Sequence, residues 1–237
     1  MESNKVNNWL NIIQDSWLPP TCILCDSPGF NRWDICYDCY CDLPRSASRC
    51  YQCAINLAHE MPINLICGDC QITQPAFDRT LAFFNYQHTM RYLIVQLKFH
   101  KHYKIARLLG TLLASEISKQ SQLPQAIIPV PLHPKRYRER HFNQSIEIAK
   151  TLSNQLQLPL LLDYCQRDRD TAHQTDLNKT ERVKNMHNAF SVSKPIPVKH
   201  IALVDDVMTT GSTLHELAAV LKQAGVQQID AWVCART

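Results

Sequence analysis

The chain is poor in glycine, in excess charge and in long apolar runs, and each shortage carries information. Among 237 residues there are 5 glycines, where average usage of about 7% would give roughly 16, so we expect each glycine to occupy a special position. No window approaches the ~18 consecutive apolar residues of a membrane-spanning helix. The N-terminus has no basic region followed by an apolar core, which excludes a signal peptide. The net charge of +4 is too small to indicate nucleic-acid binding by itself, so any basic site must be local.

The apolar content is that of a folded protein, with 45% hydrophobic and 19% charged residues. The pattern changes near residue 78, and we expect an N-terminal helix over 1–21, a small cysteine-rich domain over 22–77 and a larger domain over 78–237. Trp9, Ile13 and Trp17 form a helical stripe in the first segment. That stripe either packs on its own protein or makes peripheral contact with a membrane.

The larger domain alternates between the strand and helix periods. We expect strands over 80–86, 126–130, 201–204 and 229–234. Helices are expected from four apolar stripes: Met90, Leu93, Ile94 and Leu97; Ile105, Leu108, Leu109 and Leu112; Ile146, Ala149, Leu152 and Leu156; and Leu214, Leu217, Ala218 and Leu221, with Gly225 ending the last helix. Strands alternating with helices predict an α/β domain with a mainly parallel sheet.

Eight of the eleven cysteines form four Cys-x-x-Cys pairs: Cys22 and Cys25, Cys36 and Cys39, Cys50 and Cys53, and Cys67 and Cys70. Two such pairs complete the tetrahedral shell that Zn²⁺ favours, so sequential pairing predicts two structural zinc ribbons. An iron–sulfur cluster also takes four thiolates. Cys41 is a spare or substitute ligand. Free thiols suit a reducing cytoplasm. Because a segment this short has little core, we expect metal removal to unfold it and to leave the larger domain intact.

The segment Ile201–Leu214 has the composition of a phosphate-binding turn. An apolar strand ends in Asp205 and Asp206, and a run of small residues then opens a helix. This run consists of Thr209, Thr210, Gly211, Ser212 and Thr213. Its N–H groups can converge on one phosphate at the positive end of the helix, while the two carboxylates can accept from vicinal ribose hydroxyls. Strand closure and ordinary helix capping are the plainer interpretation.

A second candidate site lies between the expected strand 126–130 and the next helix. Four cations fall within six residues and aromatic rings alternate with them, a combination that suits either a diphosphate or single-stranded nucleic acid. A solvated surface loop is the alternative. The candidate residues of this basic segment are Val130, Pro131, Lys135, Arg136, Tyr137, Arg138, Arg140, Phe142, Asn143 and Gln144. Lys98, Lys101 and Lys104 could assist them.

The strand, acid pair and small-residue loop resemble the signature of type I phosphoribosyltransferases, which bind 5-phosphoribosyl 1-diphosphate with Mg²⁺. That resemblance implies that Asp205 and Asp206 hold the ribose and that Thr209 to Thr213 hold the 5-phosphate. In several relatives an acidic residue serves as a base at the position of Thr209. A threonine cannot be a general base near neutral pH, so binding is better supported than catalysis.

Nearly the whole chain, from Cys22 to Arg236, resembles the ComF family of competence proteins. The matching positions are the eight cysteines, Gln96 to Phe99, Pro129 to Pro131, Arg140, Phe142 to Gln144, the signature loop, Arg167, Thr171, Gln174, Arg182, Asn185 and Phe190. His141 departs from the family, which usually has glycine there. The resemblance implies a cytoplasmic role in handling incoming single-stranded DNA. It leaves open whether the protein is peripheral at the inner membrane beside other competence proteins. A nucleobase phosphoribosyltransferase of salvage metabolism is the alternative.

Overall fold

The structure is a computed structural model that describes residues 19–46, 48–57, 64–100, 102–170 and 189–237. It divides into two compact units, Met1–Leu43 and Pro44–Thr237. Several expectations lie outside the described residues: the stripe of Trp9, Ile13 and Trp17 with nearly all of the N-terminal helix, Lys101, and the family positions Thr171, Gln174, Arg182 and Asn185. None of the described helices is long and apolar enough to cross a membrane.

The first unit holds the first four paired cysteines and one short helix, α2 (Tyr37–Cys41), within its described part. Its apolar contacts are aromatic. The ring of Phe30 packs against those of Trp33, Tyr37 and Tyr40, with centroid distances of 6.2, 5.2 and 6.0 Å. So small an aromatic group gives little core, so the fold of this unit depends on its cysteines.

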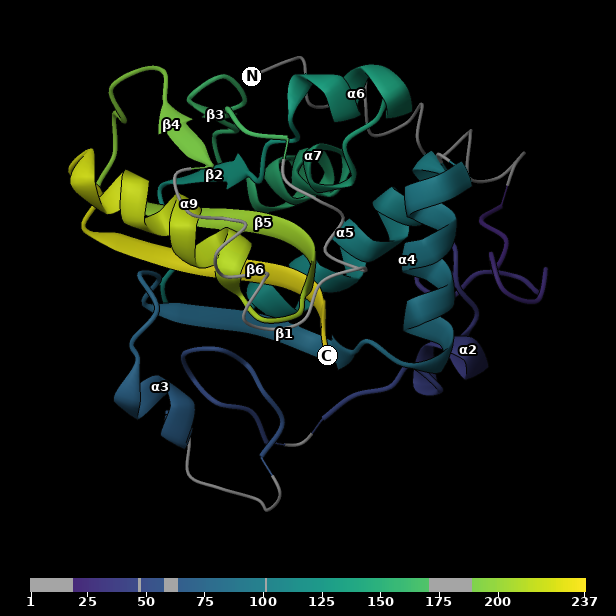
Figure 1. Cartoon of the computed structure of the whole chain (residues 1–237). Helices are drawn as coiled ribbons and strands as arrows, with labels where there is room; N and C mark the ends of the chain where they lie inside the picture. The colour runs from purple at the N-terminus through teal and green to yellow at the C-terminus, as the bar shows by residue number, and fades with distance from the viewer. Residues whose placement is uncertain (1–18, 47, 58–63, 101, 171–188) are drawn as a thin grey trace, which may run out of the picture. The chain divides into compact units, whose positions relative to one another are not determined.

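The second unit is built on a four-stranded parallel sheet, with strands β1 (Arg79–Asn85), β2 (Ala126–Pro129), β5 (His200–Met208) and β6 (Gln228–Arg236). Their order is β1-β6-β5-β2 (Figure 1). β5 and β6 lie in the centre, paired from His200 with Gln228 to Met208 with Arg236. Because both faces of these strands are covered, they are apolar nearly throughout, and Trp232 of β6 is fully buried.

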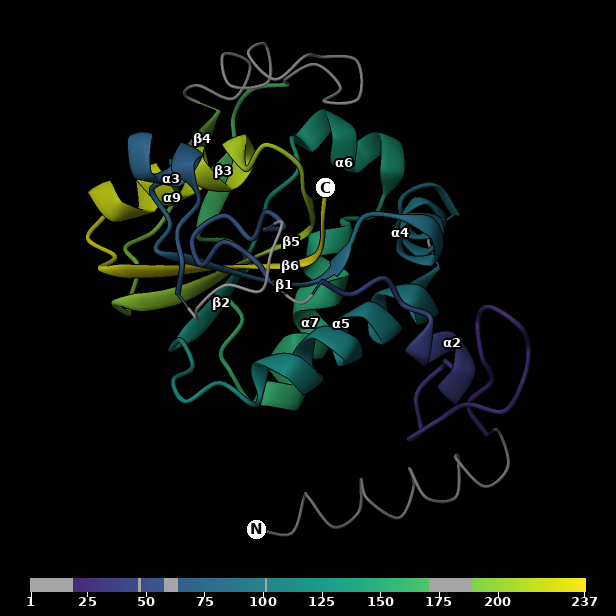
Figure 2. The ribbon, with the colours of Figure 1, turned by 90° about the horizontal axis from the view of Figure 1, so that it is seen from below.

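Helices cover both faces of the sheet. α4 (His88–His100) and α5 (Tyr103–Ile117) connect β1 to β2, and α7 (Gln144–Leu156) packs beside α5 on one face. α9 (Ser212–Gln223) connects β5 to β6 on the other face (Figure 2). The helices before and after β5 therefore lie on opposite faces, and α/β sheets with this arrangement bind ligands beyond the C-terminal end of such a strand.

Three smaller pieces complete the second unit. α3 (Gly68–Ile72) begins after its N-cap Cys67 and contains Cys70 of the last cysteine pair, and α6 (Pro134–Arg140) follows β2. β3 (Cys165–Arg167) and β4 (Phe190–Val192) form an antiparallel pair apart from the main sheet. The predicted α/β class with a mainly parallel sheet is confirmed.

The basic segment forms helix α6 rather than a loop, because Pro134 and the capping side chain of His133 start a helical turn. The helix expected from Ile146, Ala149, Leu152 and Leu156 is confirmed as α7. Its buried apolar residues are Ile148, Ala149 and Leu152, whereas Ile146 and Leu156 are half-buried. Gly225 adopts φ 94° just after the C-cap Ala224, as a helix-ending glycine does.

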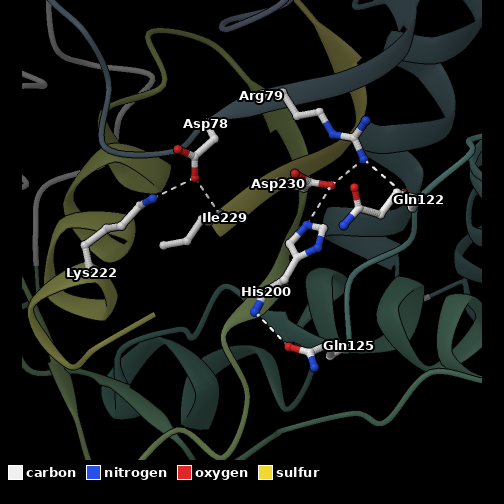
Figure 3. A network of polar contacts seen from close by, with 8 residues as sticks. All are labelled: Asp78, Arg79, Gln122, Gln125, His200, Lys222, Ile229 and Asp230. Atoms are coloured by element: carbon white, nitrogen blue, oxygen red, sulfur yellow. Dashed lines mark hydrogen bonds and ion pairs between the residues drawn. The ribbon is translucent and has the colours of Figure 1, made fainter. Parts of the chain in front are cut away.

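A polar network ties together the N-terminal ends of the strands (Figure 3). The Asp230 carboxylate, which is fully buried, lies 2.7 Å from Arg79 Nη2 and 3.3 Å from His200 Nε2. Asp78 Oδ2 accepts from Lys222 Nζ and from the N–H of Ile229, both at 2.7 Å. This network stabilises the N-terminal ends of the strands, at the opposite end of the sheet from the candidate phosphate loop.

Candidate functional site

The turn between β5 and α9 brings the predicted small residues together at the C-terminal edge of the sheet. Gly211 caps α9 with φ 80°, a left-handed conformation that favours glycine. Thr210 Oγ1 lies 2.7 Å from Ser212 Oγ and accepts from the Ser212 N–H at 3.3 Å. The first-turn N–H groups of α9 have no partner within the helix, so this turn attracts an anion such as a phosphate.

The acid pair stands directly before this turn and is largely buried. Asp205 Oδ1 accepts from Ser145 Oγ and from the N–H of Asp206, both at 2.9 Å. Burial and then the charge of Asp206 raise the pKa of Asp205 to about 7, although Lys98 and the two hydrogen bonds oppose this rise. A hydroxyl donor or a cation placed here would favour the ionised form of Asp205.

Lys98 of α4 pairs with this acid pair. Its Nζ lies 2.8 Å from Oδ2 of Asp206, a residue only 5% exposed. Burial lowers the pKa of Lys98, but the charge of Asp206, its hydrogen bond to Lys98 and the charge of Asp205 together outweigh burial, so the pKa is raised. Sequence reasoning placed Lys98 beside the basic segment and did not identify Ser145. Lys98 lies within the family string Gln96 to Phe99, and Ser145 directly follows the string Phe142 to Gln144, so those strings were the signal that pointed to them.

A second cation that acts on the acid pair is Arg167, which belongs to the antiparallel pair of β3 and β4. Arg167, at the end of β3, lies with its guanidinium carbon 5.7 Å from the centroid of the Phe190 ring. Burial lowers the pKa of Arg167, and the negative charge of Asp205 opposes that effect. Two cations, one from α4 and one from β3, therefore act on the carboxylates at the end of β5.

The basic segment begins beside β5. The N–H of Val130 donates to the carbonyl of Val204 at 2.9 Å, so the turn that contains Pro131 leaves the sheet next to the acid pair. In α6, Lys135 and Arg136 both pair with Asp170, at 3.3 and 3.0 Å. These two cations are partly neutralised within the protein.

The residues after α6 point inward. Phe142 is 3% exposed and its ring meets that of Tyr103 edge to face at 5.3 Å. Asn143 caps α7 by accepting from the Ser145 N–H, and it donates to the Val130 carbonyl at 3.1 Å. Gln144 is also buried. In this conformation Phe142 offers no open face for stacking, whereas Tyr137, Arg138 and Tyr103 are exposed.

His141 closes α6 with φ 50°, in the left-handed region. This is the position where the family usually has glycine, and the backbone conformation explains that preference, since residues with a Cβ are strained there. His141, which stands where the family usually has glycine, therefore adopts the same turn with local backbone strain.

The four cysteine pairs form two four-cysteine sites in the predicted sequential pairing. Within each site the sulfur atoms all lie within 4.8 Å of one another. The first site contains Cys22, Cys25, Cys36 and Cys39, and the second contains Cys50, Cys53, Cys67 and Cys70. Cys41 is exposed and belongs to neither site.

The sulfur spacing fits a tetrahedral zinc ion. Four Zn–S bonds of about 2.3 Å imply S···S separations of about 3.8 Å. Cys25 and Cys36 are 3.6 Å apart, and Cys53 and Cys67 are 3.7 Å apart. The N–H groups of Cys53 and Cys67 point at Cys50 Sγ, at 3.5 and 3.2 Å, as in knuckles that stabilise thiolates.

The second cysteine site is bonded to the sheet. The N–H and hydroxyl of Thr80 in β1 donate to the carbonyls of Tyr51 and Gln52, at 3.1 and 2.6 Å. A cavity of about 770 Å³ lies between this site and the phosphate loop, and Cys53, Cys70, Phe77, Thr210 and His215 are among its lining residues. The expected domain boundaries at 22–77 and 78–237 stay a prediction, and the second unit holds residues from both ranges.

Comparison with known proteins gives two family matches. Residues 13–71 match the double zinc ribbon domain and residues 143–236 match the phosphoribosyl transferase domain. The chain is 34% identical over 226 residues to "DNA utilization protein YhgH" of Salmonella typhimurium, covering 93% of this chain and 98% of that protein. It is 38% identical over 178 residues to "Competence protein F" of Haemophilus influenzae, covering 72% of this chain and 78% of that one.

A more distant relative is "Competence protein ComFC" of Streptococcus pneumoniae, 25% identical over 198 residues, covering 82% of this chain and 84% of that protein. The first two relatives are similar along most of their own length as well as along this chain. The two four-cysteine sites and the strand, turn and helix around Gly211 supply the corresponding structural features. The chain therefore belongs to the ComF family, which joins a double zinc ribbon to a phosphoribosyl transferase domain.

Proposed function

We propose that the second unit binds 5-phosphoribosyl 1-diphosphate with Mg²⁺ at the C-terminal end of β5. The observation that carries this proposal is the anion-attracting turn at Gly211 directly beside the buried acid pair. The turn Thr209 to Thr213 would bind the 5-phosphate, and Asp205 and Asp206 would accept from the ribose hydroxyls. Mg²⁺, when bound with the ligand, would supply positive charge to its diphosphate. Binding rather than turnover is proposed, because Thr209 has no acid–base chemistry near neutral pH.

Calorimetry with Mg²⁺ and 5-phosphoribosyl 1-diphosphate tests this site. The parent should bind the ligand more tightly than inorganic phosphate or ribose 5-phosphate. Asp206→Asn should weaken binding by about 1.5 to 3 kcal/mol, the typical contribution of a hydrogen bond to a charged group. The matched control is Asp163→Asn, the same change at an exposed carboxylate. Equal affinity for inorganic phosphate and the full ligand would show that the ribose is not recognised.

We also propose that the protein handles single-stranded DNA on the cytoplasmic side of DNA uptake. The names of its relatives, which mention DNA utilization and competence, support a role in DNA uptake. The supporting surface is α6 with the adjacent N-terminus of α5. Its cations include Arg138, Arg140 and Lys104, and the exposed rings are those of Tyr137 and Tyr103. Tyr103 lies against Phe142, the residue two positions after α6, so the rings and the basic helix are neighbours.

Fluorescence anisotropy with labelled single strands across a salt series tests this surface. Since Asp170 already neutralises part of α6, we count about three phosphate contacts. At a slope of roughly −0.7 per phosphate, affinity should fall about 20-fold between 50 and 200 mM salt. Arg138→Ala with Arg140→Ala should flatten the slope, whereas Tyr137→Ala should weaken binding by about 1 to 3 kcal/mol with little change in slope. Unchanged affinity and slope in the double variant would remove α6 from the DNA site.

A salvage phosphoribosyltransferase is the second candidate, favoured by the 770 Å³ cavity beside the phosphate loop. A cavity of that size can hold a nucleobase. Release of diphosphate from 5-phosphoribosyl 1-diphosphate with a panel of purine and pyrimidine bases distinguishes the candidates. Turnover with any base supports the enzyme, and binding without turnover supports the accessory role.

A further inference from the structure

Arg236, at the end of β6, bonds the second cysteine site to the phosphate loop. Its side chain is nearly buried, with the residue 8% exposed. Nε donates to the carbonyl of the zinc-site residue Cys53 at 2.9 Å. Nη1 donates to the carbonyls of Met208, at 3.3 Å, and of Thr209, the two residues where β5 becomes the loop. One planar guanidinium therefore holds both structures at once.

A second arginine bonds the same knuckle but does not reach the loop. Arg49 Nη1 donates to the carbonyl of Ala54, next to Cys53, at 3.1 Å, and its Nη2 donates to Asn85 Oδ1 at 2.8 Å. A zinc ion held by four thiolates carries a net charge of −2, and the two guanidinium groups carry +2. The charge of a metal-loaded second site thus complements the two arginines that hold its backbone.

Much of the region between the cysteine site and the loop is a cavity, although the N–H of Ala76 also donates to His215 Nδ1 of α9 at 3.1 Å. Residues of the site, such as Cys53 and Cys70, and residues of the loop, such as Thr209 and Gly211, line the same cavity of about 770 Å³. Side chains separated by an open cavity do not transmit displacement by packing. A shift of the Cys53 carbonyl therefore reaches the loop through Arg236, which hydrogen-bonds that carbonyl and the carbonyls of Met208 and Thr209.

We propose that metal at the second cysteine site supports the phosphate loop through Arg236. When the four cysteines hold the ion, the Cys53 carbonyl fixes Arg236, and Arg236 fixes the carbonyls of Met208 and Thr209. Loss of the ion loosens the turn and weakens binding of its phosphate ligand. Because coupling between two sites is reciprocal, the ligand must also strengthen retention of that ion by the same factor. The proposal concerns the second cysteine site alone, because Arg236 bonds a residue of that site.

The test uses the full zinc-loaded chain and its Arg236→Met variant, with Arg49→Met as the matched control. Both substitutions remove a guanidinium from one knuckle, and only the first reaches the loop. Arg236→Met should retain two zinc ions, bind Mg²⁺ with 5-phosphoribosyl 1-diphosphate about tenfold more weakly, and show faster hydrogen exchange over residues 209–216. Arg49→Met should stay within about twofold of the parent. Parent-like exchange and affinity in Arg236→Met would overturn the proposal.

Reciprocity gives a second measurement, resolved by residue. With a zinc-selective chelator present, adding the Mg²⁺–ligand mixture should slow alkylation of Cys50, Cys53, Cys67 and Cys70 about tenfold. Alkylation of the four cysteines of the first site should not change, and Arg236→Met should abolish the protection. Equal protection of both sites would contradict a path through Arg236.

The claim that the metal strengthens ligand binding rests on the proposed phosphoribosyl site. The claim that the metal orders the loop does not. If the parent binds no 5-phosphoribosyl 1-diphosphate, the proposed function fails. Hydrogen exchange over residues 209–216 in the parent then decides the inference, with the second site either loaded or emptied by the chelator. Exchange about tenfold faster in the emptied protein supports it, and unchanged exchange refutes it, even if Arg236→Met does not fold.

Discussion

Lys98→Met should destabilise the second unit, because it removes the ammonium group 2.8 Å from Asp206 Oδ2. At an effective dielectric constant of ~20 the attraction over that distance is about 6 kcal/mol, most of which is offset by desolvation. Removing one partner of a fully buried pair costs about 3 to 5 kcal/mol. Since the Lys98 side chain is 28% exposed, we expect a smaller loss of about 2 kcal/mol in the free energy of unfolding. Urea unfolding at pH 7 measures it.

The loss should also depend on pH through Asp205, whose pKa is about 7 in the folded protein. A carboxyl group with a higher pKa in the folded than in the unfolded state stabilises the fold when protonated. That stabilisation is complete below the unfolded value of about 4 and is lost as pH rises through the folded value. Without Lys98 the pKa of Asp205 rises further, so the deficit of Lys98→Met should grow between pH 5 and pH 8.

The control is Lys150→Met, which removes a lysine that also lies 2.8 Å from its partner, Glu147. That side chain is 50% exposed, so its loss should change stability by no more than about 0.5 kcal/mol. A double-mutant cycle with Asp206→Asn isolates the coupling between Lys98 and Asp206. If Lys98→Met equals Lys150→Met at both pH values, the ion pair does not form in solution and the electrostatic account of the acid pair is wrong.

Two further predictions concern the cysteine sites and the turn after α6. Elemental analysis should find two zinc ions per chain, and one ion or fewer, or the visible absorption of an iron–sulfur cluster, would contradict the assignment of both sites. His141→Gly should raise the free energy of unfolding by about 0.5 kcal/mol, because relief of left-handed strain exceeds the added entropy of an unfolded glycine. Thermal unfolding beside His141→Ala, which retains a Cβ and should gain nothing, measures this effect.

The main fold could be predicted from sequence because its signals are local. The stripe of Leu108, Leu109 and Leu112 marks α5, and those residues are buried as expected. A helix buried along one face must repeat its apolar residues at the helical period. The β5–Gly211–α9 turn is also local, because strand, turn and cap follow each other directly in the chain.

Other features escaped the sequence for identifiable reasons. α6 contains no apolar stripe, since it consists of Pro134 followed by charged residues and Tyr137, so periodicity could not distinguish it from a loop. The strands β3 and β4 have three residues each, too few to show alternation. Lys98 and Asp206 come together only when α4 packs beside the sheet, and neither sequence neighbourhood contains that information.

The two cysteine sites show how far spacing can be interpreted. The x-x interval fixes how two thiolates of a knuckle meet one ion, and both sites follow it. Cysteine spacing does not determine which other residues bond to the backbone carbonyl groups of a cysteine pair. The backbone of the second cysteine site bonds to Thr80 of β1 and Arg236 of β6, whereas the first cysteine site belongs to another compact unit. Chelation should therefore affect more than the cysteine-rich segment: emptying the second site removes partners from two strands of the sheet. We therefore expect the stability of the α/β part to depend on the second metal site, although the boundary predicted from the sequence assigns that site to a different domain.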